Sequence, residues 1–258
     1  MKKTLLLTSL GMAVALPATA ATFVSGGWAG LGAGSPATTT ASGSSDTQTA
    51  MVTQSVDGIT ATLQGFDSNA DADGLQLRRF DFNGVGVFNT STDETNGNDN
   101  QAGRIGTTQY LTLSFDTTVR IDLINFNNLI STNTGTEIAV LSASSFTGLN
   151  YDATGGTFTS QTGTTVSEWG YESGTGTFNI QSPGANNFTN TVRFGLDGYD
   201  SLILNAGDTL TLATDTSDGL ATQGGWALTD IEVTAVPEPS STALIGLAGL
   251  GFILRRRR

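Results

Sequence analysis

The chain of 258 residues contains no cysteine and no histidine, and both of its lysines, Lys2 and Lys3, lie at the N-terminus. Without cysteine there is no disulfide framework, no thiolate nucleophile and no cysteine-ligated metal. Without histidine there is no Ser–His–Asp triad and no imidazole zinc site. A Schiff-base or P-loop lysine in the body of the chain is also excluded. These absences rule out most of the common catalytic mechanisms, and we expect the protein not to be an enzyme.

Positive charge is scarce as well. Between residues 22 and 235, five arginines stand against 22 acidic residues, which gives this region a net charge of −17. A nucleic-acid-binding protein needs a basic face to displace counterions from phosphate, so no nucleic acid is expected as a partner. An acidic surface instead favours solubility and divalent cations.

The N-terminus has the three parts of a secretory signal peptide. Lys2 and Lys3 precede an apolar run over residues 5–16, and Pro17 then ends that run. Ala18 and Ala20 frame a small-x-small cleavage site. The pattern predicts a signal peptide over residues 1–20, cleaved after Ala20, and an exported domain over residues 21–235.

The C-terminus carries a second apolar segment. Residues 243–254 are apolar and glycine-rich, and four arginines follow at once: Arg255, Arg256, Arg257 and Arg258. A membrane-spanning helix needs roughly 20 apolar residues, so this segment predicts a short transmembrane helix, lengthened by snorkelling arginine side chains. The positive-inside rule places the arginines in the cytoplasm. The helix would anchor the protein transiently in the inner membrane.

Pro237, Glu238 and Pro239 stand just before this helix. The three parts together, over residues 236–258, resemble the PEP-CTERM sorting signal. The resemblance implies a bacterial substrate of exosortase, a membrane cysteine protease-transpeptidase that processes such tails at or near the Pro-Glu-Pro. It also implies a host that makes exopolysaccharide. The two prolines suit this role physically, because they disfavour helix and keep the backbone extended in front of the membrane.

The region between the two signals has the periodicity of strands. Apolar residues alternate with polar ones over residues 109–115 and 119–123, and shorter β-branched segments lie between Gly, Asn and Asp. Such segments occur at residues 59–63, 85–88, 137–141, 176–180, 191–196, 201–204, 209–212 and 230–234. The pattern predicts an all-β fold, an antiparallel β-sandwich of jelly-roll-like type with Trp226 in its core. Residues 84–235 resemble the sandwich domain often attached to PEP-CTERM tails.

One internal motif has the spacing of a calcium loop. Oxygen-bearing side chains recur at every second residue, at Asp67, Asn69, Asp71 and Asp73, and Gly74 follows. Such alternate oxygens are the ligands that Ca²⁺ needs. However, Phe80 stands where an EF-hand-like loop has its bidentate glutamate. A solvated turn between strands explains the motif equally well.

Trp169 and Tyr171 are two residues apart and share one face of a strand. Such aromatic rings stack on sugar rings, while nearby carboxylates accept hydrogen bonds from sugar hydroxyls. Aromatic residues that fill the sandwich core are the competing interpretation. The flanking Glu168 and Glu172 lie about 13 Å apart along an extended strand, beyond the separation of a glycosidase pair.

The sequence therefore favours an exported, non-enzymatic protein of the cell envelope or extracellular matrix, sorted through its C-terminal tail and associated with exopolysaccharide. A carbohydrate-binding module, with or without Ca²⁺, is the first alternative. A carboxylate-dependent hydrolase or lyase is a weaker one.

Overall fold

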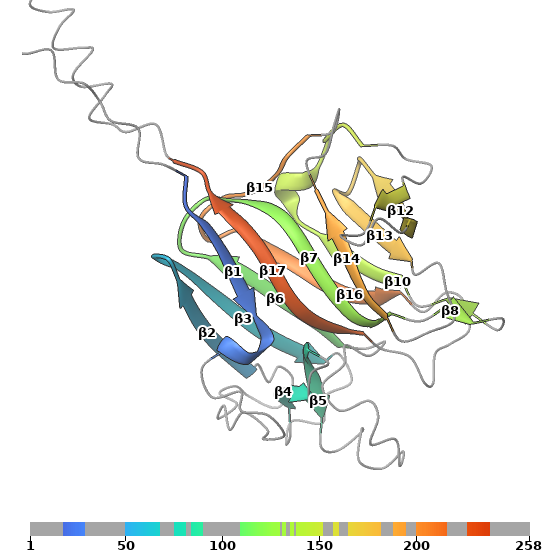
Figure 1. Cartoon of the computed structure of the whole chain (residues 1–258), viewed down its shortest axis with the longest axis horizontal. Helices are drawn as coiled ribbons and strands as arrows, with labels where there is room; N and C mark the ends of the chain where they lie inside the picture. Colours follow the sequence, from blue (N-terminus) through green and yellow to red (C-terminus); the bar gives the residue numbers. More distant parts are fainter. Residues whose placement is uncertain are drawn as a thin grey trace, which may run out of the picture.

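The computed structural model of the protein describes residues 18–28, 50–67, 75–80, 84–89, 109–129, 131–132, 135–136, 138–151, 157–159, 165–181, 188–194, 200–215 and 226–237. Within these residues the chain forms seventeen β-strands and two single-turn 3₁₀ segments, and no α-helix (Figure 1). No helix in this part of the chain is long and apolar enough to cross a membrane. The predicted all-β class is therefore confirmed.

The first layer is a seven-stranded antiparallel sheet in the order β14-β7-β17-β5-β4, in which β1 also pairs with β17 and β15 with β7. Its long central strands, β7 and β17, lie side by side (Figure 1). The strands are β1 (Ala20–Val24), β4 (Leu75–Phe80), β5 (Gly84–Asn89), β7 (Val119–Leu129), β14 (Phe188–Arg193), β15 (Leu202–Leu204) and β17 (Ala227–Ala235).

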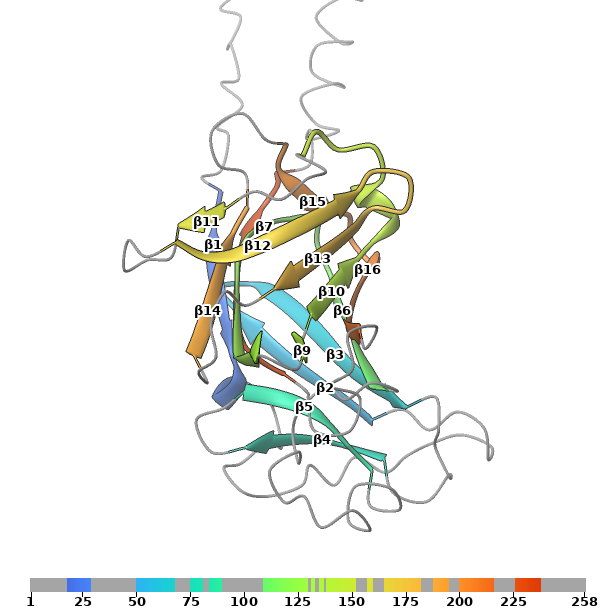
Figure 2. The ribbon, with the colours of Figure 1, turned by 90° about the vertical axis from the view of Figure 1, so that its right-hand side faces the viewer.

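The second layer is an eight-stranded antiparallel sheet in the order β11-β12-β13-β10-β16-β6-β3-β2. Figure 2 shows β12, β13 and β10 of this sheet next to one another. Its strands are β2 (Ala50–Val56), β3 (Ile59–Asp67), β6 (Gln109–Phe115), β10 (Ile138–Ser142), β11 (Thr157–Thr159), β12 (Thr165–Glu172), β13 (Thr177–Gln181) and β16 (Thr209–Asp215). A separate two-stranded ribbon joins β8 (Ser131–Thr132) to β9 (Gly135–Thr136).

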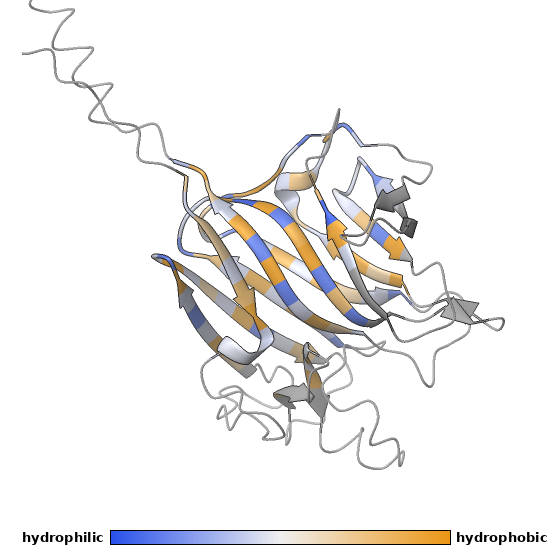
Figure 3. Cartoon of the chain, in the orientation of Figure 1, coloured by the Kyte–Doolittle hydropathy of each residue, from blue (hydrophilic) through white to orange (hydrophobic). Residues whose placement is uncertain are grey.

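Alternation along the strands builds the core. In β6, Leu111, Leu113 and Phe115 are at most 2% exposed, whereas the residues between them are partly exposed. The same alternation of apolar and polar positions is visible along β7 and β17 (Figure 3). Because side chains of a strand point alternately to its two faces, one face of each sheet packs inward and the other faces solvent. Each strand predicted from periodicity coincides with an observed strand, although residues 137, 195 and 196 of the predicted segments lie outside the described residues.

Aromatic side chains join the two layers. Trp226, fully buried at the start of β17, meets Phe126 of β7 edge to face at 4.9 Å between ring centroids. Its indole N–H donates a hydrogen bond to the carbonyl oxygen of Ala213 in the opposite sheet, at 3.2 Å. Phe23 of β1 likewise contacts Phe115 of β6. The predicted core position of Trp226 is confirmed.

A two-residue turn fixes the register of β2 on β3. Asp57 and Gly58 both have positive φ, of 51° and 83°. Aspartate followed by glycine is favoured in such hairpin turns, because glycine adopts positive φ without a steric penalty. The hairpin pairs residues 50–56 with residues 59–65.

The two ends of the described domain meet at one place. The first strand, β1, is antiparallel to the last, β17, with Ala20 opposite Thr234 and Phe23 opposite Ile231. The start of β1 and the end of β17 therefore lie side by side (Figure 1). The predicted signal-peptide cleavage site lies at the start of β1, and Pro237 follows the end of β17 after one intervening residue.

Candidate functional site

The end of β17 is held along both of its edges. The Ala235 N–H donates to the Thr19 carbonyl oxygen at 2.9 Å, on the side of β1. The next N–H, of Val236, donates to the Thr118 carbonyl oxygen at 2.9 Å, on the side of β7. Pro237 follows and is exposed. The sorting segment thus begins directly at the edge of the folded domain.

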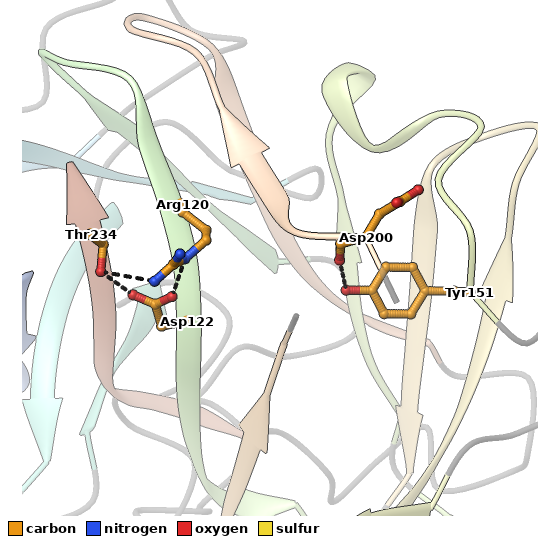
Figure 4. Close-up of polar contacts among 5 residues, drawn as sticks. All are labelled: Arg120, Asp122, Tyr151, Asp200 and Thr234. Carbon is orange, nitrogen blue, oxygen red and sulfur yellow. Dashed lines mark hydrogen bonds and ion pairs between the residues drawn. The ribbon is translucent and has the colours of Figure 1, made fainter. Parts of the chain in front are cut away.

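Side chains strengthen the contact with β7. The Thr234 hydroxyl donates to one carboxylate oxygen of Asp122 at 2.5 Å, and Arg120 forms an ion pair with the other carboxylate oxygen (Figure 4). Arg120 also contacts the Thr234 hydroxyl at 3.4 Å. The Arg120 side chain is 45% exposed, so the ion pair alone adds little to stability. The role of the Arg120–Asp122 ion pair is to hold Thr234 against β7, one residue before Ala235.

A second surface lies on the solvent face of the eight-stranded sheet. Phe66 of β3 and Tyr110 of β6 stand directly opposite each other and stack, with ring centroids 4.7 Å apart and ring planes 5° from parallel. Both residues are partly exposed. The next strand places Ala213, whose side chain is a single methyl group, opposite Tyr110.

A row of polar residues runs across the sheet beside this aromatic pair, one from each of six adjacent strands. Each member stands opposite the next in the strand register, and every member is at least partly exposed. The row consists of Gln64, Thr112, Thr211, Ser142, Thr177 and Glu172. Neighbouring members are spaced by the strand separation of about 4.8 Å. We call this row and the Phe66–Tyr110 pair the polar–aromatic face.

The structure places the residues predicted for glycan stacking differently from expectation. Tyr171 is 3% exposed, its hydroxyl donates to the Phe146 carbonyl oxygen at 2.5 Å, and its ring packs on Phe178. It presents no ring face to a ligand, so the stacking interpretation is wrong for Tyr171 and the core interpretation holds. The side chain of Trp169 lies outside the described residues, although its backbone is in β12 next to Ile180.

The structure describes almost none of the predicted calcium ligands. Asp67 ends β3, and its side chain, like the whole of Asn69, Asp71 and Asp73, lies outside the described residues. Elsewhere, the described part of the chain holds no cluster of three acidic side chains arranged for a metal ion. Calcium binding at residues 67–74 stays a prediction.

The structure describes only some of the predicted processing residues. Ala18 and Ala20 are described and exposed, and Ala20 is the first residue of β1. Pro237 is described, whereas Glu238, Pro239 and the four terminal arginines, with the predicted helix, lie outside the described residues.

One carboxyl group of the seven-stranded sheet has a shifted pKa. Burial raises the pKa of Asp230 above its ordinary value of 3.8, and the nearby Glu232 carboxylate adds to the rise. A hydrogen bond from the Asn125 side chain to Asp230, at 2.6 Å, opposes it. The ionised form of Asp230 is therefore disfavoured in the folded protein.

Asp230→Asn is expected to remove this penalty. A folded-state pKa above the unfolded one means that the free energy of unfolding falls as the pH rises from about 3.8 through the raised pKa. The variant should consequently melt higher than the wild type at pH 7, and the two should converge below pH 3.8. Thermal melts from pH 3 to pH 8 measure the difference. Asp57→Asn, at an exposed turn, is the matched control; a similar pH dependence in both variants would contradict the assignment.

The fold and the junction together define a class: an all-β sandwich whose last strand leads without a spacer into a processing tail. Residues 235–258 match the model of the PEP-CTERM protein-sorting motif. No curated protein matches the chain, and no solved structure does. The matched motif marks the chain as a protein exported and sorted to the cell surface, with exosortase as its processing partner.

The aromatic pair was not found from the sequence. The alternation over residues 109–115 placed Tyr110 on the solvent face, but the strand predicted at residues 59–63 ended before Phe66. The pair forms only because β3 and β6 adopt one particular register. Thr19 and Thr118, which hold the junction, gave no sequence signal at all.

Proposed function

We propose that the protein is a non-enzymatic component of the cell surface that contacts the exopolysaccharide of its host through the polar–aromatic face. The sorting motif supports the location, because it brings the folded domain to the outer surface. The observation that supports a role in glycan contact is the partly exposed Phe66–Tyr110 pair beside a row of hydroxyl and amide groups.

The chemistry of this face suits a neutral or weakly charged polymer of sugars. Aromatic rings pack against the apolar faces of sugar rings, and side-chain hydroxyls and amides exchange hydrogen bonds with sugar hydroxyls. Of the six residues in the row, Glu172 alone is charged. A strongly anionic polymer would be repelled by the net charge of −17 over residues 22–235.

Non-enzymatic action is supported by the composition. The chain lacks histidine and cysteine, and it has no lysine after Lys3. Before tail removal, the predicted C-terminal helix would hold the protein in the inner membrane. Thereafter, many weak contacts with a repeating polymer would retain it at the surface, since linked sites bind more strongly than single ones.

Phe66→Ala combined with Tyr110→Ala is expected to weaken binding to exopolysaccharide purified from the host by about tenfold or more, since each ring contact contributes about 0.5–1.5 kcal/mol. Co-sedimentation with the polymer measures this. Val24→Ala, an exposed apolar residue of β1 in the other sheet, is the control that leaves the polar–aromatic face intact. Unchanged binding by the double variant, with an unchanged melting temperature, would refute the glycan-contact proposal. Release of reducing ends from the polymer would refute the non-enzymatic one.

A further inference from the structure

The junction between domain and tail changes when the predicted signal peptide is removed. Hydrolysis of the Ala20–Ala21 bond adds one water molecule, leaving a carboxylate on Ala20 and an ammonium group on Ala21. Residues 18–20 then depart with the signal peptide. Thr19 leaves with them, and the hydrogen bond from the Ala235 N–H to its carbonyl oxygen is lost.

The rest of the junction stays in place. Residues 21–24 of β1 keep their pairing with residues 230–233 of β17. On the other edge, the Val236 N–H remains bonded to the Thr118 carbonyl oxygen, and the Thr234 hydroxyl to Asp122. The end of β17 is thus still fixed as an extended strand, and among the described residues none then pairs with its edge on the side of β1, which we call the open edge.

We propose that this open edge, at residues 234 and 235 of β17, is the surface on which exosortase docks, and that signal-peptide removal therefore precedes tail removal. The proposal rests on the sorting function that the motif defines. A free strand edge is a template for pairing with another chain, and main-chain hydrogen bonds along it supply affinity. Because Asp122 and Thr118 already hold the strand extended, docking costs little conformational entropy.

Proline positions make Ala235 the critical donor. Successive N–H groups of a strand point to opposite edges, so the edge facing β1 carries the N–H of Ala235 and next that of residue 237. Residue 237 is proline and has no N–H. The Ala235 N–H is consequently the last backbone donor on this edge before the Pro-Glu-Pro, and in the uncleaved precursor Thr19 occupies it.

The first test blocks signal-peptide removal in the full chain, expressed in a host that has exosortase. Ala18→Gln with Ala20→Gln replaces both small residues that the cleavage site requires, and both positions are exposed in the folded domain. The variant is expected to keep its C-terminal tail as well, with tail removal slowed about tenfold or more. Thr19→Gln, between them, is the matched control and should be processed at both ends.

The second test removes the donor and leaves the signal peptide alone. Ala235→Pro has no backbone N–H at residue 235. In the mature domain that N–H has already lost its acceptor, the Thr19 carbonyl oxygen, so the variant should keep its melting temperature. Tail removal is expected to slow by about tenfold or more, while Ala235→Gly, which retains the N–H, should behave as wild type. Mass spectrometry of both termini over time gives the two rates.

The outcomes separate this inference from the sorting function. Tail removal at the wild-type rate in either the uncleaved variant or Ala235→Pro would overturn the docking edge. The sorting function has its own test, replacement of the Pro-Glu-Pro itself. If the variant without Pro-Glu-Pro keeps its tail while the tail of Ala235→Pro is removed at the normal rate, the sorting function is supported and the docking edge is refuted.

Discussion

Trp226→Ala is expected to lower the free energy of unfolding by about 3–5 kcal/mol. The side chain is fully buried, packs edge to face on Phe126 in its own sheet and donates to the Ala213 carbonyl oxygen in the opposite sheet. Truncation leaves a cavity between the layers and an acceptor without its donor. Since domains typically have about 5–15 kcal/mol of stability in total, the variant should lose a large fraction of its stability and unfold at a clearly lower urea concentration than the wild type. Urea unfolding followed by fluorescence or circular dichroism measures the loss.

Trp226→Phe separates the two contributions. Phenylalanine retains most of the apolar volume and the aromatic contact but has no N–H, so we expect a loss nearer 1–2 kcal/mol. Equal losses in the two variants would mean that the hydrogen bond, and not the packing between the sheets, dominates at this position.

Replacement of Pro237, Glu238 and Pro239 by alanine is expected to abolish tail removal while leaving signal-peptide removal intact. These residues lie in the first part of the matched sorting motif, and alanine removes the two prolines that disfavour helix in front of the predicted C-terminal helix. The precursor should accumulate with both its domain and its tail. Immunoblotting of membrane and extracellular fractions, with mass spectrometry of the C-terminus, detects it.

The matched control for this change is Ser240→Ala with Ser241→Ala, directly after the motif's Pro-Glu-Pro. This pair alters the same stretch of chain without touching the prolines or the glutamate, and it should be processed normally. Normal tail removal in the triple-alanine variant would show that exosortase recognises another part of the motif.

Strands with clean alternation could be predicted from the sequence, and strands without it could not. The pattern over residues 109–115 gave β6 with the bounds found in the structure. β2 was missed because its inward positions include a polar residue, Gln54, which is 9% exposed and packs against Gly27. The Asp57–Gly58 turn that follows β2 was the available signal for this hairpin.

β1 was missed for a different reason. Only its first residue, Ala20, belongs to the predicted signal peptide; the other four, residues 21–24, are at the lower limit of length at which alternation identifies a strand, and the outward position 24 is the apolar Val24. Ala21 and Phe23 nevertheless alternate with Thr22 and Val24, and both are buried. The pairing of β1 with β17 depends on contacts across more than 200 residues of sequence, which local periodicity does not report.

The same pairing bears on how quickly the domain reaches its native state. The first described strand forms its ladder with the last, at the largest sequence separation among the described strand pairs. Contacts so distant in sequence carry a high loop-closure entropy and slow the folding of β proteins. When the chain crosses the membrane N-terminus first, β1 has no partner until β17 has crossed as well. Completion of the sandwich is therefore coupled to the end of export, and the sorting segment follows a finished domain only once β17 has crossed the membrane.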